Sequence, residues 1–355
     1  MAKRIKQLRR LLKESGIESL IIDGAENRFY LSGFTGTAGR ILFTPDHNYF
    51  ITDFRYVEQA EKQLEGYEII KINKDLEKKL SKILHREGVS KLCFEAEAVN
   101  YKQYEKYKKA LTGIQLEAVT GLISKLRIKK DREEISLIKT AAAVTDLAFT
   151  HILDFIKPGC TEREIALELE FFMKKQGAER NAFDFIVASG KRSSLPHGVA
   201  SDKVIRDGDF ITMDFGCFYN GYCSDMTRTI VVGKPTKKQR DIYDIVLKAQ
   251  QEVKKRVKAG MLCKDVDAIA RDIITDKGYG SRFGHGLGHG IGVEVHEEPR
   301  VSYTSDTVLE DGMVITDEPG IYIPEWGGVR IEDDLLITED GCEVLNDSPR
   351  ELISL

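Results

Sequence analysis

Apolar residues recur with helical spacing at the start of the chain and form short strand-like runs soon after it. Ile5, Leu8 and Leu12 fall on one face of a helix within the stretch MAKRIKQLRRLLKESG. The apolar run SLIIDG at 19–24 predicts a strand, and ILFTPDHNYFITD at 41–53 predicts a hairpin. We therefore expect the first part of the chain to be an α/β domain.

A charged segment, residues 125–134, separates this part from the rest of the chain. We expect the segment to be helical, because a periodic apolar face begins directly after it, at Ile135, Ile138, Ala142 and Leu147. Thr161-x-x-Glu164 fits a capping box that opens a further helix, and Gly177 can close that helix. The pattern predicts an N-terminal domain over residues 1–122 and a second domain over residues 123–355.

Apolar and polar residues alternate in the stretch DGDFITMDFGCFYNGYCSD, which begins at Asp207. This alternation places Asp214 on the polar face of a strand, opposite an apolar face formed by Ile211, Met213 and Phe215. The turn residues 219–222 allow the chain to double back and bring Asp225 alongside Asp214. Two carboxylates this close repel each other unless a cation or a shared proton lies between them.

The same stretch recurs 104 residues later as DGMVITDEPGIYIPEWGGVRIED. The offset carries Asp214 onto Glu318, and a second hairpin would pair Glu318 with Glu332. Upstream the match continues at an offset of 101, so that each half reads helix, Lys-x-Gly turn, helix, Gly stop and acidic hairpin. We infer a two-fold pseudo-repeat, whose copy number is too low for a solenoid. Two facing halves would bring four carboxylates together.

Composition and charge narrow the classes of function. The chain has 355 residues, and its 53 basic and 57 acidic side chains give a net charge of -4, which argues against broad binding of nucleic acid or anionic membranes. No apolar run approaches a membrane span, and the start lacks the apolar core of a signal peptide. The six cysteines show no zinc-type spacing, so we expect reduced thiols and a cytoplasmic protein.

Between the two acidic stretches lies FGHGLGHGIGVEVHEEP, residues 283–299. His285 and His289 are four residues apart, but the glycines between and around them destabilise a helix, so this is not an HExxH helix. On an extended strand both histidines still face one side. No GxGxxG register is complete, which argues against a dinucleotide site. The alternative is a glycine-rich loop whose histidines are satisfied within the fold.

Asp214, Asp225, Glu318 and Glu332 with one imidazole form an oxygen-rich set of ligands. Four carboxylates exceed what one small divalent ion needs, so the set favours a carboxylate-bridged pair of ions such as manganese or cobalt. Two such ions lower the pKa of a shared water and polarise a carbonyl, which indicates hydrolysis. The alternative is four acids on exposed turns, but both copies of the repeat carry an acid at the same strand position.

The order DFG…SDMTRT, HGLGHGIGVEVHEEP, TDEPGIYIP and GVRIEDD strongly resembles the pita-bread metallopeptidases. The resemblance is to the branch that contains aminopeptidase P and Xaa-Pro dipeptidase (prolidase), and it covers nearly the whole chain. It implies an α+β protein with a creatinase-type α/β N-terminal domain and a duplicated pita-bread α+β catalytic domain.

The resemblance also implies roles for individual residues. Five positions match the ligands of two metal ions: Asp214, Asp225, His289, Glu318 and Glu332. Asp225 and Glu332 would bridge the ions, and Glu318 would also shuttle protons. His197 and His296 match histidines that contact the substrate carbonyl and stabilise the tetrahedral intermediate. His285, Tyr322 and Arg330 match positions on the proline side of the site, where Arg330 could pair with a carboxylate or orient a ligand instead.

The resemblance predicts an exopeptidase that uses a metal-bridged hydroxide to hydrolyse the bond between an N-terminal residue and proline. It implies two divalent ions, manganese or cobalt, small proline-containing peptides as substrates, and a homodimer. Two alternatives are a metal-free creatinase-like hydrolase and an inactive module that binds proteins, although no ligand is missing here. Asp317 departs from the family pattern, because an apolar residue is usual before the ligand glutamate.

Overall fold

The computed structural model describes the whole chain, Met1–Leu355. The chain divides into two compact units, Met1–Arg127 and Ile128–Leu355. The boundary placed between residues 122 and 123 from the sequence falls close to the end of the first unit. Each unit has its own sheets and its own core.

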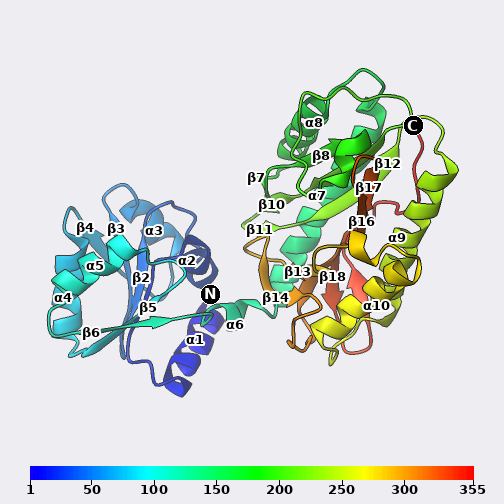
Figure 1. Cartoon of the computed structure of the whole chain (residues 1–355). Coiled ribbons are helices and arrows are strands. Elements are labelled where there is room, and N and C mark those ends of the chain that lie inside the picture. The colour runs from blue at the N-terminus through cyan, green and yellow to red at the C-terminus, as the bar shows by residue number, and fades with distance from the viewer. The chain divides into compact units, whose positions relative to one another are not determined.

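The N-terminal unit is a mixed six-stranded sheet in the order β4-β3-β2-β1-β5-β6, flanked by helices (Figure 1). The predicted first helix is confirmed as α1 (Ala2–Glu14), which buries Ile5, Leu8 and Leu12. The predicted hairpin is confirmed as the antiparallel pair β2 (Arg40–Phe43) and β3 (Asn48–Asp53). The other elements are β1 (Leu20–Ile22), α2 (Ala25–Ser32), α3 (Val57–Gln63), β4 (Glu68–Ile72), α4 (Leu76–Arg86), β5 (Lys91–Glu95), α5 (Tyr101–Ala110), β6 (Gln115–Val119) and α6 (Ser124–Arg127).

The second unit consists of two halves that follow the same order of elements, two helices and then antiparallel strands, as the pseudo-repeat predicts. The first half comprises α7 (Arg132–Phe155), α8 (Glu162–Lys175), β7 (Arg180–Asn181), β8 (Ile186–Ser189), η1 (Gly190–Ser194), β9 (Phe210–Phe215), β10 (Cys217–Tyr219), β11 (Tyr222–Cys223) and β12 (Met226–Val231). The second half comprises α9 (Lys237–Arg256), α10 (Cys263–Asp276), η2 (Gly280–Arg282), β13 (Gly288–Gly290), β14 (Glu297–Val301), β15 (Val314–Asp317), β16 (Gly320–Ile323), β17 (Gly327–Arg330), β18 (Asp333–Ile337) and β19 (Cys342–Val344).

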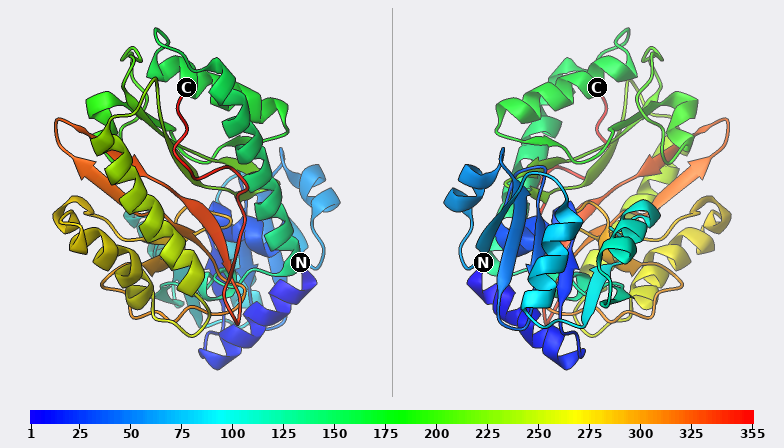
Figure 2. Two further views of the ribbon diagram at one scale, coloured as in Figure 1. Left: turned by 90° about the vertical axis from the view of Figure 1, so that its right-hand side faces the viewer. Right: turned by 90° about the vertical axis from the view of Figure 1, so that its left-hand side faces the viewer.

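Each half of this unit packs its helix pair against its own strands. Ile211, Met213 and Phe215 of β9 lie in the core beneath α7 and α8, so the predicted apolar strand face is confirmed. Ile315 and Leu335 lie in the core beneath α9 and α10. The strands lie between the two helix pairs (Figure 2). The polar strand faces are thereby turned toward the middle of the unit.

Local sequence signals explain where several elements begin and turn. Thr161 and Glu164 form the predicted capping box at the start of α8, and Gly177 follows its end with φ 99°. The predicted turn is confirmed between β10 and β11, where Asn220 and Gly221 both have positive φ. Positive φ at two consecutive turn residues matches the right-handed twist of a two-residue hairpin.

The structure differs from three of the sequence-based predictions. The charged segment 125–134 is not one helix, because α6 ends at Arg127 and α7 begins only at Arg132, after the N-cap Asp131. Leu147 is 52% exposed, since the buried face of α7 passes through Thr145, Ala148 and Phe149 instead. The prediction that no apolar run approaches a membrane span also differs, because α7 is long and apolar enough to meet the criteria for one. Core helices of soluble proteins pass the same test, and 44% of the apolar window of α7 is buried.

Candidate metal centre

Five side chains from both halves converge on the middle of the second unit. Asp214 lies on β9 and Asp225 directly precedes β12, while Glu318 follows β15 and Glu332 precedes β18. β9 pairs with β12 and β15 pairs with β18, both antiparallel, so each half contributes one pair of neighbouring acids. His289 comes from β13, which pairs with β15.

These side chains lie close enough together to bind a shared metal ion. His289 Nε2 is 3.8 Å from Asp225 Oδ2 and 3.6 Å from Glu318 Oε1. Ligand atoms of Asp225, His289 and Glu332 all lie within 4.8 Å of one another. The negative charge of Asp214 acts on Asp225, Glu318 and Glu332. The structure therefore brings all five sequence-predicted ligands together.

Three acids of this cluster are buried and Glu318 is partly buried, and the cluster has too few donors. Burial first, and then repulsion from Asp214, raises the pKa of Glu332 to about 8. Burial and the charge of Glu332 also raise the pKa of Asp225 and Glu318 well above their usual values. One oxygen each of Asp214 and Asp225 is buried without a hydrogen-bond partner. A set of buried, mutually repelling carboxylates is what divalent cations would stabilise, so the residues present fit a metal pair.

His289 is oriented as a metal-binding imidazole. Its Nδ1 lies 3.1 Å from the carbonyl oxygen of Gly290, which directs Nε2 toward the acids. Burial, followed by the neighbouring His296, lowers the pKa of His289 to about 4. The imidazole is thus neutral near pH 7, and the neutral ring is the form that binds a metal.

The three residues assigned to the proline side form a chain of hydrogen bonds that ends on a ligand. His285 Nε2 lies 2.9 Å from Tyr322 Oη, and Arg330 Nη1 donates to the same oxygen at 2.9 Å. Arg330 Nη2 donates to Asp214 Oδ2 at 2.5 Å, and Arg330 Nε donates to Thr227 Oγ1 at 2.9 Å. Arg330 is therefore tied to the metal cluster as well as to Tyr322.

The two histidines assigned to catalysis lie on exposed segments at the edge of the cluster. The rings of His296 and His289 have centroids 4.3 Å apart. His197 follows η1, and its charge acts on both His285 and His296. The adjacent Pro196 accepts a hydrogen bond from Arg330 Nη1 at 3.3 Å. The structure thus places both histidines around the same group of side chains.

Sequence reasoning missed Thr227, although it lies two residues after Asp225 in the quoted SDMTRT motif. Thr227 Oγ1 donates to Glu332 Oε2 at 2.6 Å, so one strand of the first half orients a ligand of the second. The even spacing along β12 was the signal that could have identified it, because residues two apart share a strand face.

Asp317 is adjacent to Glu318, so it lies on the opposite strand face, and it is paired with Asp333 across β15 and β18. Neither carboxylate oxygen of Asp317 has a hydrogen-bond partner. Burial, followed by the charge of Asp333, raises the pKa of Asp317 well above its usual value. Burial without a hydrogen-bond partner therefore disfavours the charged form of the Asp317 carboxyl group.

Comparison with known families and structures agrees with this geometry. Residues 136–339 match metallopeptidase family M24, and residues 4–129 match the creatinase/prolidase N-terminal domain. The chain belongs to the M24 metallopeptidases, which confirms the predicted pita-bread fold with its creatinase-type N-terminal domain. Membership in this family implies divalent metal ions.

Full-length relatives are similar along the whole chain. An Xaa-Pro dipeptidase from Pyrococcus furiosus is 43% identical over 355 residues, which cover 99% of this chain and 100% of the relative. The structure of an Xaa-Pro dipeptidase from Bacillus anthracis has a TM-score of 0.98 and 51% identity, and covers 100% of this chain and 99% of that one. An X-Pro aminopeptidase from Thermotoga maritima has a TM-score of 0.91 and 40% identity, with coverage of 98% and 100%.

Proposed function

We propose that this metallopeptidase hydrolyses the peptide bond between an N-terminal residue and a following proline. The observation that carries the proposal is the buried cluster of four acids and one imidazole in an M24 fold. The names of the full-length relatives, Xaa-Pro dipeptidase and X-Pro aminopeptidase, support the choice of substrate. The intact cluster argues against the metal-free and the inactive alternatives.

We assign Asp214, Asp225, His289, Glu318 and Glu332 to holding two divalent cations. Bound there, the cations would lower the pKa of water and polarise the peptide carbonyl. The oxygen-rich set with one imidazole favours manganese, with cobalt as the alternative. Glu318 Oε1 lies 3.6 Å from His289 Nε2 and belongs to a carboxyl whose pKa is raised by burial. Glu318 is therefore suited to take up and return a proton.

The surrounding residues would bind and orient the peptide. His197 and His296 lie on exposed segments beside the cluster, where their ring nitrogens can donate to the carbonyl oxygen of the cleaved bond. His285 and Tyr322 would contact the proline side. Arg330 has four of its five N–H donors engaged by Thr227, Pro196, Tyr322 and Asp214. Arg330 is therefore assigned mainly to orienting Asp214, with one N–H left for a substrate carboxylate.

The cellular setting and assembly are also part of the proposal. All six cysteines are free thiols and five of them are buried, which supports a reducing compartment such as the cytoplasm. The family resemblance supports a homodimer. Small peptides, rather than nucleic acid or membranes, are the partners that the charge balance of the chain favours.

Comparing an Xaa-Pro dipeptide with the matching Xaa-Pro-Yaa tripeptide tests the proposal. The protein is loaded with manganese or cobalt, and release of the N-terminal residue is measured for both peptides. A third peptide with alanine in place of proline serves as the control. Cleavage of the dipeptide alone identifies a dipeptidase, and cleavage of the tripeptide identifies an aminopeptidase. Equal cleavage of the alanine peptide would contradict the proposed specificity.

A further inference from the structure

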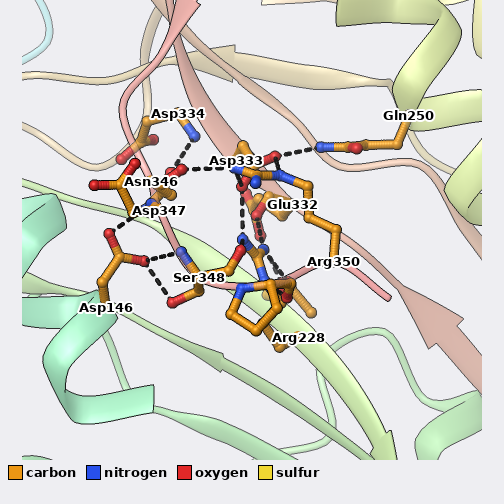
Figure 3. Close-up of polar contacts among 12 residues, drawn as sticks. Asp146, Arg228, Gln250, Glu332, Asp333, Asp334, Asn346, Asp347, Ser348 and Arg350 are labelled. Atoms are coloured by element: carbon orange, nitrogen blue, oxygen red, sulfur yellow. Dashed lines mark hydrogen bonds and ion pairs between the residues drawn. The ribbon is translucent and has the colours of Figure 1, made fainter. Parts of the chain in front are cut away.

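A second buried polar cluster lies behind the metal ligands, on the opposite face of β18. Asp333, the residue after Glu332, is fully buried. Its carboxylate accepts from Arg228 Nη2 at 2.7 Å, from Arg350 Nε and Nη2 at 2.5 and 2.9 Å, and from Lys254 Nζ at 3.2 Å. Gln250 Nε2 donates to it as well (Figure 3). This number of donors fixes the position of one carboxylate in space.

The same cluster fixes the backbone of Glu332. Arg228 Nη1 donates to the carbonyl oxygens of Glu332 and Thr227, at 2.5 and 2.9 Å. The Glu332 amide in turn donates to the Thr227 carbonyl at 3.1 Å. One guanidinium group thus binds the Glu332 carbonyl, the Asp333 carboxylate and the Thr227 carbonyl that accepts from the Glu332 amide. The direction of the Glu332 side chain therefore depends on this cluster.

The backbone of Asp225 is held by Asp334, the next residue of β18. The Asp225 amide donates to Asp334 Oδ2 at 3.1 Å, and the Asp334 amide donates to Asn346 Oδ1 at 2.7 Å. Asp225 and Glu332 are the two ligands that the family resemblance assigns to bridging the cations. Both are thus connected, through one intermediate residue each, to a single stretch of chain, residues 346–350.

The 346–350 segment links the two halves of the unit. On one side, Asp146 of α7 accepts from the amides of Asp347 and Ser348 at 2.8 and 2.9 Å, and from Ser348 Oγ at 2.5 Å (Figure 3). On the other side, Arg350 binds Asp333, and Arg228 donates to the carbonyl oxygens of 348 and 349. The segment is a fixed support between α7 and β18.

We propose that the 346–350 segment positions the two bridging carboxylates, with Arg350 and Asn346 as the positioning residues. Arg350 acts through Asp333 on Glu332, and Asn346 acts through Asp334 on Asp225. The inference rests on the proposed metal centre. Outer partners of metal ligands set the direction of the ligands, and their loss weakens metal binding or activity by about 10- to 100-fold.

Cobalt binding by the full-length protein tests the inference without relying on turnover. We expect Arg350→Met and Asn346→Leu to weaken cobalt binding by about tenfold or more and to change the visible absorption of the cobalt-saturated protein. Arg350→Lys keeps the charge but not the two-pronged contact, so it should lie between Arg350→Met and the unaltered protein. Arg163→Met, which breaks an exposed pair with Asp202, is the matched control and should change neither readout.

The readouts separate positioning from general support of the fold. Cobalt affinity and spectra are compared at a temperature at which thermal unfolding shows each variant to be folded. Unchanged affinity and spectrum in both Arg350→Met and Asn346→Leu would overturn the inference, and if Arg350→Met does not fold, the other two variants decide. An unaltered protein that binds cobalt but cleaves no Xaa-Pro peptide would refute the proposed function and leave the positioning comparison valid. A protein that binds no cobalt would overturn both.

Discussion

Glu332 and Asp333 are consecutive buried carboxylates with opposite surroundings. Asp333 is neutralised by the chain itself, since Arg228, Arg350 and Lys254 hold its pKa below the usual range although burial alone would raise it. Glu332 faces other acids, and its pKa is raised to about 8 by burial and by Asp214. The two faces of one strand thus hold a satisfied charge and an unsatisfied one.

This difference shows how a binding site can be distinguished from a structural ion-pair network. Both are buried and acidic, so burial or composition alone does not separate them. In the Asp333 cluster, cationic side chains outnumber the carboxylate that they bind. In the Glu332 cluster the acids outnumber the single guanidinium of Arg330. Bound cations can supply the positive charge that the chain lacks on this face, and membership in the M24 metallopeptidases implies divalent metal ions.

The largest expected effect is a loss of turnover when an acid of the Glu332 cluster, the proposed metal centre, is replaced. Asp225→Asn takes away a proposed ligand oxygen and a negative charge. We therefore expect turnover of an Xaa-Pro peptide to fall more than about a hundredfold, because changes to the outer partners of ligands already cost about 10- to 100-fold. Steady-state hydrolysis and metal content are measured on the same sample. Activity equal to that of the unaltered protein, together with stoichiometric metal loss, would refute the assignment.

An Asp→Asn substitution at Asp333, on the other strand face from Glu332, should lower the stability of the protein. Asp333→Asn leaves buried Arg228, together with Arg350 and Lys254, without the carboxylate that balances them, and breaking a buried pair this way costs about 3–5 kcal/mol. Urea unfolding of the metal-free protein measures the change. Asp202→Asn removes an exposed partner of Arg163 and should change stability little. Equal stability of the two variants would show that the Asp333 cluster is not a structural network.

The metal side of this comparison could be predicted from the sequence, because its signals are local or repeated. Alternation along β9 fixes the face of Asp214, and the 104-residue offset transfers that position to Glu318. Extended spacing in the glycine-rich stretch placed His285 and His289 on one side, and the family resemblance selected His289 as the ligand. The assignment of exposed Leu147 to the core face was wrong, since periodicity alone cannot locate the edge of a buried stripe.

The Asp333 cluster could not be predicted in this way. Arg228 lies 105 residues from Asp333, and Arg350 approaches from the 346–350 segment, which has no regular secondary structure. Such partners depend on the tertiary fold and leave no periodic signal in the chain. Asp317 was recognised as unusual from the sequence, but its lack of a hydrogen-bond partner became evident only from the packing of β15 against β18.

The smallest expected effect is a change in the stability of the metal-free protein. It gives the sharpest test, because an Asp→Asn substitution should stabilise the protein at Asp225 but destabilise it at Asp333. In the metal-free protein Asp225 is repelled by Glu332, Asp214 and other acids, and one of its oxygens has no donor. Asp225→Asn removes that repulsion, so we expect the metal-free protein to be stabilised by about 1 kcal/mol, as is common when a residue kept for function is replaced.

Urea unfolding in the presence of a chelator measures this gain, and the same experiment with saturating manganese provides the control. Manganese stabilises only a folded state that binds it, so the unaltered protein should then become the more stable of the two. Destabilisation of metal-free Asp225→Asn, in the same direction as Asp333→Asn, would mean that the chain already satisfies the charge of Asp225. The contrast between the two strand faces would then be lost, and with it the reason to place cations on one face only.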